Sequence, residues 1–140
     1  MIVAANPAMY KELIAVWESS VKATHHFIAA DYLQEIKALL PDILPQVNLV
    51  VYQDNDKIAG FAGVAGEKLE MLFVLPELMG KGIGKALLLY CIDQLQVNTV
   101  DVNEQNEQAT GFYQNMGFTI YNRKPLDGMG KPYPILEMKL

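Results

Sequence analysis

Three glycines alternate with other residues in the segment "GKGIG" at 80–84, directly before a run with the pattern of a helix. Glycine is a poor helix former, but it has no Cβ, so the backbone can curve tightly and a ligand can approach it closely. The free N–H groups in the first turn of a helix, together with the helix dipole, favour an anion. Gly80, Gly82 and Gly84 therefore predict a phosphate-binding turn. A flexible turn that caps the helix is the simpler alternative.

Two common phosphate-binding motifs do not fit this segment. The loop of nucleoside-triphosphate-binding proteins needs G-x-x-x-x-G-K-[ST], but the span from Gly80 to Gly84 is one residue short. Ala86 also stands where that loop has the hydroxyl that binds magnesium. The dinucleotide fingerprint G-x-G-x-x-G fails because Gly84 comes one position early. Nucleotide phosphotransfer would require magnesium-dependent ATP binding, which the broken loop predicts to be absent.

The periodicity of apolar residues predicts the elements that hold this turn. Asn6 and Pro7 are expected to begin the first helix, Pro41 and Pro45 to end the second, and Gly117 to end the last. In chain order, the predicted elements are a short strand at 2–3, helices at 8–21 and 29–40, a hairpin around 54–56, a strand at 68–76, a helix at 83–95, a strand at 98–103, a helix at 104–116, and strands at 118–124 and 132–140.

The arrangement of these elements predicts a mixed sheet with helices on both faces. The strand at 68–76 is apolar on both sides, so we expect helices to cover it from both directions. The helix that follows the glycines has a buried stripe at steps of four residues, formed by Ile83, Leu87, Cys91 and Leu95.

Composition limits the class of protein. A chain of 140 residues, 51% apolar and 19% charged, is expected to form one globular domain over 1–140. No signal segment is expected at the N-terminus, and the longest apolar run, 86–92, is too short to cross a membrane. One cysteine excludes an internal disulfide, so we expect a cytoplasmic protein. The net charge of -5 argues against nucleic acid as a partner and suits a cationic substrate.

The glycine turn resembles the first motif of the GNAT family, the acetyl-CoA-dependent N-acetyltransferases. That motif, V-x-P-x-x-[QR]-G-x-G-[IV]-G-x-x-L, is matched here by "VLPELMGKGIGKAL" at 74–87, with Met79 in place of the usual Gln or Arg. The resemblance covers essentially the whole chain, and "ATHHF", "VNEQNEQATGFY" and "GKPYPIL" look like the YjaB-type bacterial branch. The second motif, N-x-x-A-x-x-F-Y-x-x-x-G-F, is matched by Asn106, Ala109, Phe112, Tyr113, Gly117 and Phe118.

The resemblance implies a fold and an activity. The fold is α+β, with a central mixed, mostly antiparallel sheet of six to seven strands. The activity is transfer of an acetyl group from acetyl-CoA to a primary amine, either a small molecule or a protein amine, without a metal. Members of the family often form homodimers. A non-catalytic acyl-CoA-binding or regulatory domain is the alternative, and Met79 is its best support.

The same resemblance assigns residues to the coenzyme. Met79, which lacks a polar group, leaves Lys81 or Lys85 as the source of positive charge. The residues expected to bind the pyrophosphate are Met79, Gly80, Lys81, Gly82, Ile83, Gly84 and Lys85. Those expected to contact the pantetheine arm are Leu72, Phe73 and Val74 through their backbone, and Asn103, Asn106 and Phe112. Apolar core packing and a polar residue in the first turn of a helix are the plain alternatives for these positions.

Two residues are expected to move protons. The resemblance assigns the general acid for the coenzyme thiolate to Tyr113, because a phenol stays protonated at neutral pH; packing beside Phe112 is the alternative. Glu70 is the candidate general base, since at alternating strand positions it shares a face with Leu72 and Val74. A carboxylate there is expected to be largely buried. The alternative is a solvent-facing position near a strand edge.

The acceptor amine is expected to lie near two loops. His25 and His26 are adjacent, so they do not share a helix face and do not predict a metal site. In this family the loop that contains them borders the acceptor cleft, where either histidine is a candidate to bind or deprotonate the amine; capping or packing is the alternative. The other wall is expected to be formed by Asp127, Lys131, Pro132 and Tyr133.

Overall fold

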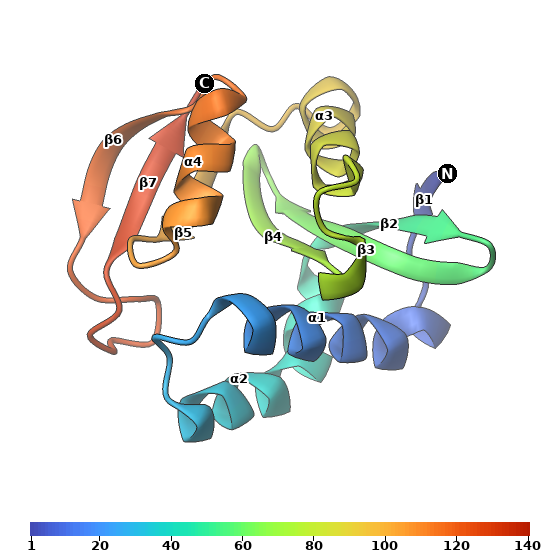
Figure 1. Ribbon diagram of the computed structural model, residues 1–140, viewed down its shortest axis with the longest axis horizontal. Helices are drawn as coiled ribbons and strands as arrows, with labels where there is room; N and C mark the ends of the chain where they lie inside the picture. The colour runs from blue at the N-terminus through green and yellow to red at the C-terminus, as the bar shows by residue number, and fades with distance from the viewer. The chain divides into compact units, whose positions relative to one another are not determined.

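The chain forms four helices and seven strands (Figure 1). The computed structural model describes all residues from 1 to 140, in two units, 1–97 and 98–140. The first unit contains β1 (Ile2–Ala4), α1 (Tyr10–Thr24), α2 (Ala30–Ile43), β2 (Asn48–Asp54), β3 (Lys57–Ala65), β4 (Lys68–Val74) and α3 (Ile83–Leu95). The second unit contains β5 (Thr99–Asn103), α4 (Glu107–Asn115), β6 (Thr119–Lys124) and β7 (Ile135–Lys139).

In the first unit, β1, β2, β3 and β4 pair in that order, and every pair is antiparallel. The predicted hairpin is confirmed: Asn55 and Asp56 join β2 to β3 with φ angles of 52° and 66°. Asparagine and aspartate tolerate this left-handed conformation better than other non-glycine residues.

Both faces of this sheet carry helices (Figure 1). Val51, Phe61 and Phe73 lie opposite one another in register, and they belong to the core formed with α1 and α2. The alternate positions on the same strands point to the opposite face, which α3 covers. Both α1 and α3 contact β4, so the prediction that helices cover this strand from both sides is confirmed.

The predicted end of the second helix is wrong. α2 continues to Ile43 with Pro41 inside it, and the short 3-10 turn that contains Pro45 follows. Proline removes one backbone hydrogen bond of a helix, but here it lies in the last turn. Leu40 and Leu44 on either side are 3% and 1% exposed. We infer that their burial outweighs the lost bond.

In the second unit, β5 and β6 both pair with β7 in antiparallel fashion. α4 begins after Asn106 and is followed by Gly117, whose φ of +100° ends the helix as predicted. In α4, Tyr113 is buried, whereas Ala109, Phe112 and Met116 are half-buried. The predicted α+β class and strand number are confirmed.

Candidate functional site

The glycine turn connects the end of β4 to α3. After Val74, Leu75 extends the pairing, because its amide donates to the carbonyl of Ala59 at 2.8 Å. A 3-10 turn at Pro76–Leu78 then redirects the chain, and Gly82 is the N-cap of α3. The sequence predicted this succession of strand, turn and helix.

Gly80 and Gly82 both adopt left-handed backbone conformations, with φ of +79° and +85°. A Cβ placed on either glycine would meet no atom within 4 Å. These glycines are therefore not needed to pack against the rest of the chain. They allow a strained turn, and the space beside them is open to a ligand.

The backbone amides of residues 80–85 have no hydrogen-bond partner in the chain. The first bond of the helix is donated by Ala86 to the carbonyl of Gly82, at 2.9 Å. Ile83 is 6% exposed and anchors the turn, while Lys81 and Lys85 are exposed. Free amides, two lysines and the N-terminus of a 13-residue helix suit an anion such as a diphosphate.

Tyr113 and Asn106 of the second motif lie in the second unit. Tyr113 is 7% exposed, and its ring packs edge-on against Phe112 and Phe118, with centroids 5.2 and 5.8 Å away. Asn106 caps α4: its Oδ1 accepts from the amide of Ala109 at 3.2 Å. Its side-chain oxygen is therefore used within the helix, which leaves Nδ2 as the group for a ligand. Asn103, at the end of β5, is half-buried.

The expected burial of Glu70 is wrong: this side chain is exposed. The register between β3 and β4 shifts here, since Met71 pairs with Gly63 and Leu69 pairs with Val64. Glu70 is the extra residue of this bulge, so strand alternation does not determine its direction. The physical reason for expecting a general base at Glu70 is therefore absent.

The two histidines differ in their surroundings. His25 directly follows α1 and is half-buried, whereas His26 is exposed. Burial, and to a smaller extent the charge of His26, lowers the pKa of His25. In the second unit, the side chain of Asp127 organises the loop before β7 by accepting from the amides of Met129 and Lys131, at 3.0 and 2.9 Å. Tyr133 lies half-buried in this loop.

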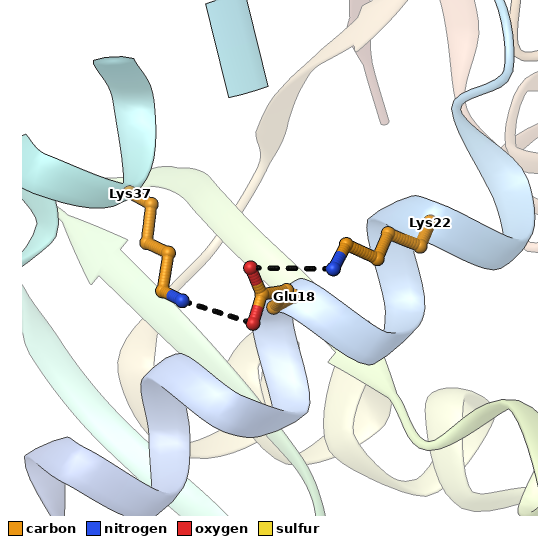
Figure 2. Close-up of polar contacts among 3 residues, drawn as sticks. All are labelled: Glu18, Lys22 and Lys37. Carbon is orange, nitrogen blue, oxygen red and sulfur yellow. Dashed lines mark hydrogen bonds and ion pairs between the residues drawn. The ribbon is translucent and has the colours of Figure 1, made fainter. Parts of the chain in front are cut away.

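Two polar arrangements were not predicted from the sequence. Glu18 on α1 lies between two lysines, with its oxygens 3.0 Å from Nζ of Lys37 on α2 and 3.5 Å from Nζ of Lys22 (Figure 2). The hydrogen bond from Lys37 is the main cause that lowers the pKa of Glu18. The other arrangement is a contact between Thr24 and His25. Of these contacts, only the one between Glu18 and Lys22, four residues apart on one helix, could have been predicted from the sequence.

Other reactive groups give no second site. Cys91 is fully buried in α3, and burial raises the pKa of its thiol to about 11. It is therefore a thiol at neutral pH and a poor nucleophile or metal ligand. No group of three or more His, Cys, Asp or Glu side chains is arranged to hold a metal ion. None of the four helices has the length and apolar character that a membrane span requires.

Comparison with known proteins gives consistent matches. The sequence matches the family model described as the acetyltransferase (GNAT) domain over residues 11–127. It is 43% identical over 129 residues to the peptidyl-lysine N-acetyltransferase YjaB of Salmonella typhimurium, which covers 91% of this chain and 89% of that protein. The solution structure of apo-form YjaB from Escherichia coli has a TM-score of 0.90 at 37% identity, covering 99% of this chain and 95% of that one.

A more distant structure has the same fold. It is the PaiA N-acetyltransferase from Thermoplasma acidophilum in complex with coenzyme A. Its TM-score is 0.76 at 23% identity, and the match covers 100% of this chain and 98% of that one.

Proposed function

Because this chain belongs to the GNAT family of acetyltransferases, as its two motifs predicted, we propose that it acetylates the side-chain amine of lysine in proteins. It is an acyltransferase that uses acetyl-CoA. The protein acceptor is proposed from the 43% identical relative, which is named a peptidyl-lysine N-acetyltransferase. The net charge of -5 supports a cationic acceptor. The single cysteine favours the reducing cytoplasm as the location.

The observation that carries this proposal is the set of free amides at 80–85. When bound, acetyl-CoA supplies the acetyl group as a thioester. The amides of the glycine turn bind its diphosphate, and Lys81 and Lys85 add positive charge where Met79 has none. The backbone of 72–74, directly before the turn, orients the pantetheine arm. These contacts fix the position of the acetyl group relative to the acceptor amine.

We assign the general acid to Tyr113. A phenol remains protonated at neutral pH and can donate to the leaving thiolate. Burial of the ring against Phe112 and Phe118 fixes its orientation and excludes water. Asn106, with its oxygen engaged at the helix cap, offers Nδ2 to a carbonyl of the pantetheine arm. His25, His26 and Tyr133 are the proposed contacts for the acceptor.

A thiol-release assay tests this function. The full chain is given acetyl-CoA and either a lysine-containing peptide, a polyamine, an amino acid or an aminoglycoside, and acetylated products are identified by mass spectrometry. We expect turnover with the lysine peptide. Tyr113→Phe should lower kcat by about 100-fold or more, with coenzyme affinity retained. Coenzyme binding without turnover on any amine would overturn the enzymatic function and leave a coenzyme-binding domain.

A further inference from the structure

A bulge in β3 holds the end of β4 that leads into the glycine turn. The register between β2 and β3 shifts after Tyr52, and Ala59 is the extra residue on β3. The carbonyl of Ala59 accepts from the amide of Leu75 at 2.8 Å. This bond extends the sheet by one residue beyond the end of β4, directly before the 3-10 turn at Pro76–Leu78.

A carboxylate from α1 accepts from the residue next to this bulge. The amide of Ile58 donates to Oε1 of Glu12, which lies in the first turn of α1, at 3.2 Å. Ile58 is buried, and a buried amide without an acceptor is costly. Two neighbouring residues of β3 are therefore bonded to two different segments. Ile58 is bonded to the start of α1, and Ala59 is bonded to the chain that enters the glycine turn.

Apolar packing joins the same segments. Leu13, the neighbour of Glu12, is fully buried and belongs to one core with Ile58 and Leu75. Leu78, at the end of the 3-10 turn, packs against this core, and its amide donates to the carbonyl of Leu75 at 2.9 Å. α1 also contacts the 3-10 turn. The start of α1, the bulge of β3 and the 3-10 turn therefore form one packed block.

The glycine turn has few contacts of its own that could fix its position. A Cβ on Gly80 or Gly82 would meet no atom within 4 Å, and the amides of residues 80–85 have no partner in the chain. Its position therefore depends on the segments that flank it. These are the buried Ile83 on the α3 side and the block around Leu75 on the β4 side.

We propose that Glu12 is a positioning residue for the coenzyme. It acts through Ile58 and Ala59 on the chain that enters the glycine turn, and not by direct contact with the coenzyme. This inference rests on the proposed function, in which the turn binds the diphosphate of acetyl-CoA. Without the carboxylate, a smaller fraction of molecules has the turn in its binding arrangement. The apparent Kd for the coenzyme then rises by the inverse of that fraction.

The sign of the change in Kd separates positioning from two other roles of Glu12. A carboxylate repels a diphosphate, so a purely electrostatic effect through space predicts that removing the charge lowers the Kd. A purely structural role predicts a lower stability with an unchanged Kd. Positioning predicts a higher Kd.

Three substitutions of Glu12 and one control distinguish these roles. Glu12→Gln keeps an acceptor oxygen at the same reach, and the Kd should stay within about twofold of wild type. Glu12→Asp keeps the charge but is one methylene shorter, and Glu12→Ala removes the acceptor. Both should raise the Kd by about 5- to 10-fold, as expected for one lost hydrogen bond. Glu18→Ala, on the same helix but bonded to Lys37 of α2, is the matched control and should bind like wild type.

The Kd is measured by isothermal titration calorimetry of the full chain with coenzyme A, after urea unfolding has shown that each variant is folded. With acetyl-CoA and a lysine peptide, Glu12→Ala should raise the KM for acetyl-CoA by a similar factor, while kcat stays near the wild-type value. In ¹H–¹⁵N spectra without coenzyme, the amide signals of Ile58, Leu75 and Gly80 should shift in Glu12→Ala and stay in place in Glu18→Ala.

An unchanged or lower Kd in Glu12→Asp and Glu12→Ala would overturn the positioning role and leave the proposed function intact. If Glu12→Ala does not fold, the comparison of Glu12→Asp with Glu12→Gln decides in the same way. Coenzyme binding that depends on Glu12, without turnover on any amine, would support the positioning role and overturn the enzymatic function alone. Absence of coenzyme A binding by the wild type would overturn both.

Discussion

Replacing Gly82 with alanine should weaken coenzyme binding much more than it destabilises the fold. Gly82 has a φ of +85°, where an alanine costs about 1–2 kcal/mol. The new Cβ would meet no atom within 4 Å, so no clash adds to this strain. For a chain of this length, we expect the midpoint of thermal unfolding to fall by about 3–7 °C.

The effect on the coenzyme should be larger, because the Cβ would occupy the open space beside the free amides. Loss of one hydrogen bond from an amide to a charged phosphate costs about 1.5–3 kcal/mol, which is about a 10- to 100-fold increase in Kd. Isothermal titration calorimetry with coenzyme A gives the affinity, and thermal unfolding gives the stability.

Gly66→Ala is a matched control for this experiment. Gly66, in the turn between β3 and β4, has a φ of +61°, and a Cβ there also meets nothing within 4 Å. It should show a similar loss of stability with an unchanged Kd. Equal affinity for coenzyme A in the Gly82 and Gly66 variants would refute the assignment of the diphosphate to the glycine turn.

Two further predictions concern the first unit. Gly60→Ala should destabilise by about 1–3 kcal/mol in urea unfolding, since its Cβ would lie 2.8 Å from the carbonyl oxygen of Phe73 on the neighbouring strand; an unchanged midpoint would contradict this. Glu18→Gln should lower the free energy of unfolding by up to about 1 kcal/mol at neutral pH, as is typical when an ion pair near the surface is removed. Lys37 lowers the pKa of Glu18 in the folded state. The ion pair therefore adds to the free energy of unfolding at pH values above the pKa of glutamate in the unfolded chain, about 4.3. This stabilisation disappears as the pH falls through the lower pKa of Glu18 in the folded chain. A difference between Glu18→Gln and wild type that persists in acid would contradict the assignment.

Local sequence signals predicted the elements around the site well. The hairpin at Asn55–Asp56, the left-handed Gly117 after α4 and the glycine turn depend on backbone conformations that few residues adopt. Such signals act over a few residues, so they can be read without knowledge of the fold. The two family motifs predicted acetyltransferase activity, and the matches to known acetyltransferases confirmed that prediction.

The errors arise where distant segments decide the outcome. Pro41 stays inside α2 because Leu40 and Leu44 are buried against the core. Glu70 is exposed because a bulge in the pairing with β3 interrupts the alternation of β4. These features follow from packing and register, which the sequence pattern does not encode.

The most direct test of the central claim is an NMR titration of the full chain with coenzyme A, observed through its backbone amides. We predict that the largest changes in ¹H and ¹⁵N shifts fall on residues 80–85, whose amides have no partner in the chain. Gly66, in an equally open turn, should not respond. Saturable binding that leaves the signals of residues 80–85 in place, or no binding at all, would contradict the account.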